Sequence, residues 1–437
     1  MNHPVRDISK YDGETFDYSS VEDFLARTSF RSGLHAIYLQ DGIFFELLWR
    51  DSAADTTVVV FNGAGYPGDM KRPGFSVTGV MGQVRKRVAA NALFVHDPTL
   101  YVAPSLSLAW YSGALGLDTQ GIVDDCIRHL ISNSSTERVA FFGVSGGGFA
   151  SLRTAAHFPG SVAIACIPQV ILPEYEDWAV ERYYEYCWGI EPADFRSGGE
   201  SVRELPFTWD VRSLYRDGVG SHPLLLLNSS DSHHVDIHAA KFVEARPHPT
   251  HVVMRTWGDG HVGPLPDFFA DIFVSLVECE DWSSYDWAPS AVTVSTAGEL
   301  KALASARPDV VRVEYDGPVT LGESSVRLPF PNEIFGTLEV VVTLDCEGDL
   351  RGQDALIVLR GDVRETWDAV GLHFNPAFEH SPFLYLATRP GSRDVKIRVR
   401  IPRGGGVSGM EVLGWNPQGK AQNVRVLRVS AKVFEDQ

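Results

Sequence analysis

The chain has 437 residues, of which 44% are hydrophobic and 22% charged, and this is the composition of a soluble globular protein. A chain of this length exceeds one ordinary hydrophobic core, so we expect at least two domains. The formal net charge of -18 argues against nucleic acid or an anionic membrane surface as a main partner, because both select for basic patches.

The N-terminal segment is polar and contains no apolar stretch of the kind that a secretory signal needs. No apolar run further along the chain is long enough to span a bilayer. The five cysteines are odd in number and widely scattered, which fits reduced thiols rather than a disulfide framework. We therefore expect a cytoplasmic protein.

The first predicted strands form a hairpin followed by a buried strand. Leu34 to Leu39 and Ile43 to Trp49 are apolar runs separated by Asp41-Gly42, and Asp-Gly is a strong hairpin signal. Thr57 to Phe61 (TVVVF) is a continuous run of the kind that fills a central strand. The loop that follows, Asn62 to Gly68, is rich in glycine. Its glycines either form a plain turn or place a functional amide.

The stretch RVAFFGVSGGGFASLRT joins a predicted strand to a predicted helix through a glycine-rich turn. Val139 to Phe142 is an apolar run compatible with a buried strand, and Phe149 to Ala156 is the start of a helix. Between them the chain has the pattern G-x-S-x-G around Ser145. Strand, motif and helix in this order resemble the nucleophile elbow of the α/β-hydrolases. Because the turn is sharp, neighbours without Cβ atoms let strand and helix approach closely.

Other glycine motifs need residues that this stretch lacks. A P-loop requires a Lys-Ser/Thr pair after its glycines, and none is present. A dinucleotide fingerprint that starts at Gly146 would need Gly or Ala where the chain has Ser151, and no acid follows the next strand near Ile167. A tight turn with an incidental serine stays open from the motif alone, so residues elsewhere must decide.

Strands and helices continue to alternate beyond the elbow. Val162 to Ile167, His222 to Leu227 and His251 to Arg255 are apolar runs of strand length, and Leu265 to Cys279 is expected as a closing helix. This order predicts a mostly parallel sheet with helices on both faces. Residues 170–218 interrupt the alternation and are rich in aromatic and acidic side chains. We expect a helical cap over the active site there, with an ordinary helical insertion as the alternative.

The resemblance to α/β-hydrolases implies a catalytic triad in the chain order Ser, acid, His. The sequence supplies Ser145 as nucleophile, Asp231 after the run LLLLN as the orienting acid, and His261 after VVMRTWGDG as the base. The resemblance also implies an oxyanion hole. Its candidate donors are the backbone amide of Gly146 and that of Gly63 or Ala64. No cofactor and no metal are expected.

Other residues near the expected acid and base offer alternatives. Asp236 and Asp259 are the other candidate acids, but Asp259 is too close in sequence to His261 to reach behind its ring. His233, His234 and His238 are other candidate bases, and we interpret the first two as residues of a substrate pocket or the surface. A metal site built from these three histidines would lack the helical pairing with a glutamate that zincins use.

From about Ala288 onward the composition changes to repeated short apolar runs separated by turn signals. Many of the runs alternate between apolar and polar residues, which predicts half-buried antiparallel strands and a β-sandwich. We therefore expect an α/β-hydrolase domain over residues 1–288 and a β-sandwich over 289–437. The expected strands are Val310–Tyr315, Leu338–Leu344, Leu356–Arg360, Val370–Phe374, Phe383–Ala387, Val395–Ile401 and Val424–Val433. Trp367, His373 and Trp415 are its candidate ligand-facing rings, and core packing is the alternative.

Three classes of function follow from these features. The first is a serine esterase acting on a small-molecule or glycan ester, such as a carbohydrate O-acetyl esterase whose sandwich binds the glycan. The second is an acyltransferase or peptidase that uses the same triad. The third is a non-enzymatic protein that keeps the elbow as structure. A protein partner could bind through the C-terminal domain.

Overall fold

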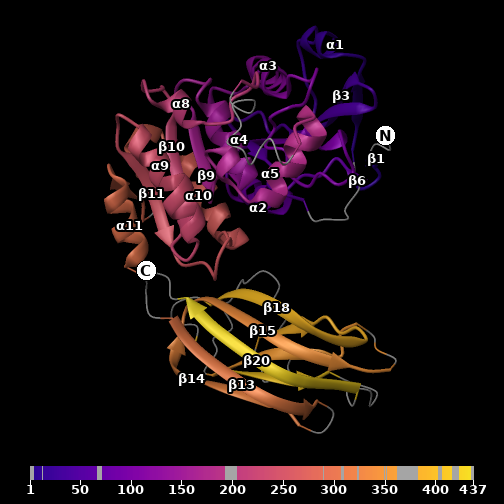
Figure 1. Cartoon of the computed structure of the whole chain (residues 1–437), viewed down its shortest axis with the longest axis vertical. Coiled ribbons are helices and arrows are strands. Elements are labelled where there is room, and N and C mark those ends of the chain that lie inside the picture. Colours follow the sequence, from indigo (N-terminus) through magenta and orange to yellow (C-terminus); the bar gives the residue numbers. More distant parts are fainter. Residues whose placement is uncertain are drawn as a thin grey trace. The chain divides into compact units, whose positions relative to one another are not determined.

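The computed structural model divides the chain into two compact units (Figure 1). The first comprises Met1–Met254 with Gly260–Ser305, and the second comprises Arg255–Asp259 with Ala306–Gln437. The residues described are 4–11, 13–65, 71–191, 204–288, 290–306, 310–321, 324–348, 350, 352–361, 382–401, 406–415 and 423–434.

A ten-stranded sheet forms the centre of the first unit. Five neighbouring strands of this sheet pair parallel to one another: β7, β5, β8, β9 and β10. The N-terminal hairpin of β3 and β4 joins them through β4, which pairs antiparallel with β7. The strand order is β12 (Val292–Val294), β11 (Thr250–Arg255), β10 (His222–Asn228), β9 (Val162–Cys166), β8 (Arg138–Val144), β5 (Thr56–Phe61), β7 (Asn91–Val95), β4 (Ile43–Arg50), β3 (Gly33–Gln40) and β2 (Thr15–Tyr18).

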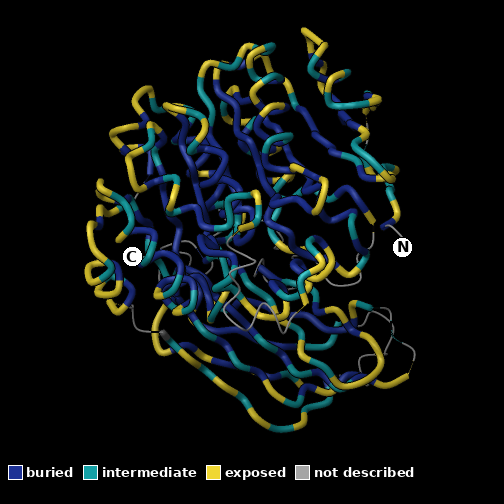
Figure 2. The backbone as a smooth tube through the Cα atoms, turned by 45° about the horizontal axis from the view of Figure 1, so that its top comes forward, coloured by how far each residue is buried: buried dark blue, intermediate teal, exposed yellow. Residues whose placement is uncertain are grey.

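Helices cover both faces of this sheet, as the alternation predicts. Neighbouring residues of a strand point to opposite faces. Phe142 of β8 contacts Phe269 and Phe273 of α10, while Phe141 belongs to a buried cluster with Ile127 of α3. The central strands β5, β7 and β9 are accordingly buried along their whole length, while the edge strands β2 and β12 contain exposed residues. Exposed residues also lie on loops and outer helix faces (Figure 2). The helices are α1 (Val21–Leu25), α2 (Thr78–Arg87), α3 (Thr119–Ser132), α4 (Gly146–Ala155), α9 (Ala240–Ala245), α10 (Pro266–Glu278) and α11 (Ala297–Ser305).

The insertion after β9 is helical where it is described. Some of its aromatic side chains pack inward, since Tyr183 and Tyr184 are fully buried and Trp188 stacks on Phe207. Trp178 and Tyr186 are exposed. A bridge between Ile171 and Asp210 joins its two ends. The elements are η2 (Leu172–Glu174), α5 (Asp177–Tyr183), η3 (Tyr184–Trp188) and α8 (Arg212–Tyr215).

Remaining short elements complete the first unit: β1 (Val5–Arg6), β6 (Lys71–Arg72), η1 (Pro98–Tyr101), η4 (His234–Ala239) and η5 (Trp282–Ser284). Among the helices of the described ranges, none combines the length and the apolar character needed to cross a membrane. All five cysteines lie in those ranges and are thiols.

The second unit is the expected antiparallel β-sandwich. Its two four-stranded sheets enclose a core to which Leu338 of one sheet and Ile357 of the other contribute. The expected strand Val370–Phe374 lies outside the described residues. One sheet has the order β13 (Val310–Thr320), β20 (Val424–Phe434), β15 (Gly336–Cys346) and β18 (Gly391–Ile401), and the other β14 (Val326–Ile334), β19 (Val407–Gly414), β16 (Ala355–Gly361) and β17 (Phe383–Leu386).

The boundary between the units lies further along the chain than the sequence predicts. β12 extends the large sheet, because Val294 pairs with Thr250 of β11. Leu300 of α11 is fully buried in the core of the first unit. The composition changes near residue 288, but the apolar side chains that follow still pack against the first domain.

Candidate active site

Ser145 occupies the sharp turn between β8 and α4. Its backbone dihedrals, φ 57° and ψ −118°, are strained for a residue with a side chain. A Cβ atom on Gly143 would overlap the backbone of Gly147, and one on Gly147 would lie 2.5 Å from the carbonyl oxygen of Phe61. The glycines are therefore required by close backbone contacts, and the turn holds the serine at the carboxyl end of the sheet.

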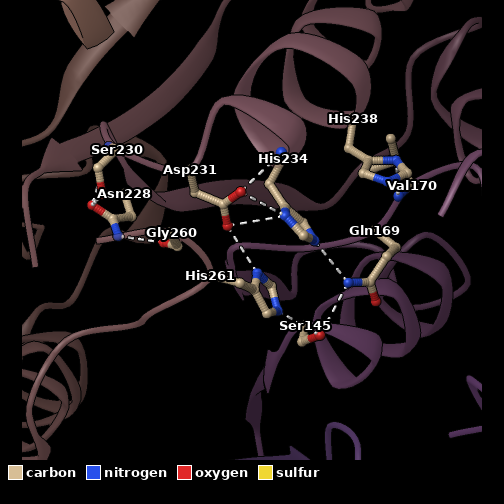
Figure 3. Close-up of polar contacts among 10 residues, drawn as sticks. All are labelled: Ser145, Gln169, Val170, Asn228, Ser230, Asp231, His234, His238, Gly260 and His261. Carbon is tan, nitrogen blue, oxygen red and sulfur yellow. Dashed lines mark hydrogen bonds and ion pairs between the residues drawn. The ribbon is translucent and has the colours of Figure 1, made fainter. Parts of the chain in front are cut away.

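The three residues expected as a triad meet in one hydrogen-bonded chain (Figure 3). Nε2 of His261 lies 2.9 Å from Oγ of Ser145, and Nδ1 of His261 lies 2.8 Å from Oδ2 of Asp231. Ser145 and Asp231 are buried, while the ring of His261 is partly exposed. Burial alone would raise the pKa of Asp231, but hydrogen bonds from His234 and His261 hold that pKa well below its usual range.

Two loops carry the acid and the base, and a side-chain amide joins them. Asp231 follows β10, and His261 follows β11. Between these loops, Nδ2 of the buried Asn228 donates to the carbonyl oxygen of Gly260, at 2.8 Å. Gly260 has φ +72°, a conformation that favours glycine, and it directly precedes His261. This contact fixes the backbone from which the imidazole reaches Ser145.

Two further residues lie at the site: Gln169, which the sequence did not indicate, and His234, which the sequence offered as an alternative base or as a pocket or surface residue. Gln169, just beyond the end of β9, donates from Nε2 to Oγ of Ser145 at 3.0 Å. The same nitrogen lies 2.9 Å from Nε2 of His234, whose Nδ1 lies 3.0 Å from Oδ1 of Asp231. His234 is buried and not a surface residue, and its ring stacks on His261 with centroids 4.0 Å apart. The available signal was the position of Gln169 after a parallel strand, beside the elbow.

The loop after β5 contains Gly63 and Ala64 and lies on the opposite side of the elbow from Gln169, because β5 and β9 flank β8. Gly146 is the first residue of α4, where backbone amides have no partner within the helix. A Cβ atom on Gly63 would lie 2.7 Å from the carbonyl oxygen of Val144 and 3.6 Å from Cβ of Ser145. The loop that contains Gly63 and Ala64 therefore lies beside the serine.

Of the alternative acids and bases, His234 lies in the hydrogen-bonded group around Ser145, and the others have other partners or are exposed. Asp236 is exposed and pairs with Lys301 at 3.6 Å, and Asp259 is exposed as well. His238 is buried, which lowers its pKa to about 2, and its Nδ1 lies 3.4 Å from the backbone nitrogen of Val170. His233 contacts its neighbours through ring edges.

Within the described ranges, one group has the donor atoms of a metal site. These are Asp231, His234 and His261, whose donor atoms all lie within 4.8 Å of one another. The set of His233, His234 and His238 weighed from the sequence does not form such a group there. Since both imidazoles already lie at hydrogen-bond distance from the carboxylate, the geometry is that of a hydrogen-bonded network.

Strand order and elbow together decide the architecture. The sheet runs β3, β4, β7, β5, β8, β9, β10 and β11, with the serine after β8, the aspartate after β10 and the histidine after β11. The first unit has the α/β-hydrolase fold. Its insertion after β9 contributes Tyr175, whose ring contacts Trp110 and His234 next to Ser145.

Comparison with solved structures returns proteins that are similar to part of this chain. The capsule O-acetyltransferase of Neisseria meningitidis serogroup A is 16% identical, covers 57% of this chain and 97% of its own, and has a TM-score of 0.43. An esterase of Pyrococcus furiosus is 14% identical over 64% of this chain and 96% of its own, with a TM-score of 0.38. Est1E of Butyrivibrio proteoclasticus is 14% identical over 56% and 98%, with a TM-score of 0.35. No family model and no curated protein matches the sequence.

The second unit has a groove of about 510 Å³ on the face of one sheet. At the groove, the carboxylate of Glu411 lies 2.9 Å from Nε of both Arg327 and Arg360. Of the candidate ligand-facing rings, Trp367 and His373 lie outside the described residues. Trp415 is half-buried and contacts Tyr385, with ring centroids 6.3 Å apart. The groove is lined by Arg327, Leu328, Pro329, Arg360, Ser408, Gly409, Met410 and Glu411.

Proposed function

We propose that this protein is a serine hydrolase that cleaves a carboxylic ester through an acyl-enzyme on Ser145. The observation that carries the proposal is the unbroken hydrogen-bonded chain from Ser145 through His261 to Asp231 at a strained elbow. A serine hydroxyl is a weak nucleophile until a base within hydrogen-bond reach can accept its proton. Strained backbone dihedrals of this kind cluster at functional sites.

In this proposal each residue of the chain has a chemical role. As Oγ of Ser145 bonds to the acyl carbon, its proton passes to Nε2 of His261, which then protonates the departing alcohol. Asp231 accepts from Nδ1 and stabilises the imidazolium. The amide of Gly146, with that of Gly63 or Ala64, is the proposed donor pair for the oxyanion. Water, activated by His261, then releases the acid and regenerates the hydroxyl.

The surroundings of Ser145 favour a short acyl group. Ser145 is only 7% exposed. A Cβ atom on Gly146 would overlap the side chain of Leu108 and lie 3.2 Å from Cδ1 of Trp110, so both side chains pack tightly beside the serine. An acetyl ester fits this constraint better than a long-chain ester. A carbohydrate O-acetyl ester is our specific proposal, with the groove near Glu411 as the candidate glycan contact.

The test is labelling with a fluorophosphonate probe, followed by a panel of 4-nitrophenyl esters of increasing acyl length. We expect the native chain and Ser151→Ala to be labelled and Ser145→Ala to remain unlabelled, and we expect acetyl esters to be cleaved fastest. Ser151 is the matched control, because its buried hydroxyl bonds to the carbonyl oxygen of Gly148 within α4. Labelling of Ser145→Ala at the native level would refute the nucleophile.

The product distinguishes hydrolysis from acyl transfer. With a sugar or short alcohol added to the reaction, a hydrolase releases acetate, whereas a transferase releases the acetylated alcohol. A native chain that takes up no probe at all would favour the non-enzymatic interpretation.

A further inference from the structure

The polar groups around Ser145 close into a ring and do not end at the acid. From Oγ of Ser145 the contacts run through His261 to Asp231, on to His234, then to Gln169 and back to Oγ (Figure 3). Gln169 is completely buried and His234 almost so. Asp231 is shared by two imidazoles, and Oγ of Ser145 is shared by His261 and an amide.

One side of this ring runs from Asp231 through His234 and Gln169 to Ser145, and we call it the second side. A group that can only donate fixes the direction of every hydrogen bond along it. The indole nitrogen of Trp110 can only donate, and it lies 3.1 Å from Oε1 of Gln169. The oxygen of the Gln169 amide is therefore turned to Trp110 and its NH₂ group to the serine. That NH₂ group has two hydrogens, one for Oγ of Ser145 and one for Nε2 of His234.

The same logic assigns the tautomer of His234. Because its Nε2 accepts from Gln169, a neutral His234 carries its proton on Nδ1 and donates it to Asp231. Burial lowers the pKa of His234 to about 4, so the ring is neutral at neutral pH. Oγ of Ser145 accepts from Gln169, so its own hydrogen is free to point at His261.

We propose that Gln169 is a further catalytic residue, whose amide donates to Oγ of Ser145 when that oxygen leaves the acyl group, and that His234 is its positioning residue. His234 bridges Gln169 to Asp231 and thereby holds both sides of the ring. The inference rests on the proposed function, because it assigns these residues to the breakdown of the acyl-enzyme.

The chemistry distinguishes the two half-reactions. In acyl-enzyme formation, the amide of Gln169 donates to Oγ of Ser145 both before the attack and during it. Removing this amide therefore changes the free energies of the ground state and of the transition state similarly. In the acyl-enzyme, Oγ is an ester oxygen and a poor acceptor. When the second tetrahedral intermediate collapses, the bond from Oγ to the acyl carbon breaks, Oγ takes the electron pair, and the proton returns from His261. The amide stabilises the charge that develops on Oγ at this point.

The kinetic test uses Gln169→Glu and Gln169→Met, with Gln120→Glu and Gln120→Met as matched controls. Gln120 is also a buried glutamine, but its amide bonds to the backbone of Thr208. We expect both Gln169 variants to hydrolyse the acyl-enzyme about tenfold or more slowly, the loss typical of a hydrogen bond to a charged group. Acyl-enzyme formation should slow less, so acetylated protein accumulates and is visible by intact mass.

A double-mutant cycle tests the positioning role. If His234 acts through Gln169, the two substitutions should not have independent effects. The double variant Gln169→Met/His234→Phe should then lose visibly less deacylation rate than the added free-energy effects of the two single variants predict. His238→Phe is the control for His234→Phe, because His238 is a buried ring in contact with His234. Additive losses in the double variant would overturn the positioning role.

A spectroscopic measurement keeps the proposal falsifiable even if a variant does not fold. Imidazole ¹⁵N shifts in the native chain report the tautomer of each histidine. We expect neutral His234 to carry its proton on Nδ1. A proton on Nε2 would overturn the hydrogen-bond directions and with them the proposal.

The remaining outcomes separate this inference from the proposed function. If the native chain forms an acyl-enzyme but the folded Gln169 variants deacylate at the native rate, the inference fails and the proposed function stands. If Ser145 is never acylated, the proposed function fails and takes the inference with it.

Discussion

Asp231 in the first unit and Glu411 in the second are both almost completely buried carboxylates held by nitrogen-containing side chains. In the α/β-hydrolase unit, Asp231 accepts from His234 and His261. In the sandwich, Glu411 accepts from Arg327 and Arg360, and the hydroxyl of Ser325 lies 2.5 Å from its Oε1. Burial alone would raise the pKa of Glu411, but these hydrogen bonds lower that pKa to about 2.

The partners make the two carboxylates different. A guanidinium stays charged at every pH a protein meets, so the cluster around Glu411 cannot pass protons to a reacting group. An imidazole can gain and lose a proton near neutral pH, so the cluster around Asp231 can respond to chemistry at Ser145. Similar burial and similar hydrogen bonding therefore give a fixed charge in one unit and a proposed catalytic group in the other.

The largest loss should follow removal of the base. For His261→Ala we expect the turnover of an acetyl ester to fall about 10³-fold or more, because triad residues act as a unit. The hydrogen bond to Oγ of Ser145 is lost, and within the described residues His261 is the imidazole that lies at hydrogen-bond distance from that oxygen. Turnover close to native in this variant would show that another residue is the base.

Removal of the acid should cost nearly as much. For Asp231→Asn we expect a loss of about 10³-fold or more, since the carboxylate fixes the tautomer of His261. Asp236→Asn and Asp259→Asn should turn over as the native chain does, because both side chains are exposed. A severe Asp236→Asn variant beside an active Asp231→Asn variant would reverse the assignment of the acid.

The matching change in the sandwich should affect stability and not turnover. Glu411→Gln leaves two guanidinium groups without their carboxylate, and we expect the second unit to lose about 1–3 kcal/mol of stability. Amide hydrogen exchange in β14, β16 and β19 measures this loss. Hydrolysis of a small ester should stay at the native rate. A loss of turnover without a change in exchange would link this cluster to the active site.

The pH dependence of the sandwich should follow Glu411. The pKa of Glu411 is about 2 in the folded chain and 4.5 in the unfolded chain. Ionised Glu411 therefore stabilises the folded unit above pH 4.5. That contribution is lost as the pH falls from 4.5 towards 2. Exchange protection in β19 should therefore weaken over this interval in the native chain, and weaken less in Glu411→Gln. Equal pH profiles in the two proteins would contradict the assignment.

The smallest effect is expected for removal of the sandwich. A chain that ends at Ser305 keeps β12 and α11, and we expect it to fold and to cleave small esters at the native rate. A chain that ends near Ser290 loses the buried Leu300 and should be less stable. A folded chain ending at Ser305 that is inactive on small esters would show that the sandwich contributes to catalysis, and the separation of roles would then be wrong.

Local sequence patterns predicted most of the fold. The strand β5 and the helix α10 were predicted to within a few residues, because their own apolar side chains determine that they are buried. The sandwich was predicted from alternation in strands such as β18. The domain boundary was placed too early, because the end of a domain depends on which core a segment joins and not on its own composition.

The sequence by itself determined the elbow around Ser145 and, through the order of residues after successive strands, the candidates Asp231 and His261. Each depends on a short segment whose structure follows from its own residues. Only the tertiary structure decided the side of the ring that runs from Asp231 through His234 and Gln169 back to Ser145. Gln169, His234 and Trp110 come from three separate segments, and none belongs to a local motif. Their hydrogen bonds exist because the fold brings the segments that follow different strands together, so that Trp110 and His234 both reach the amide of Gln169.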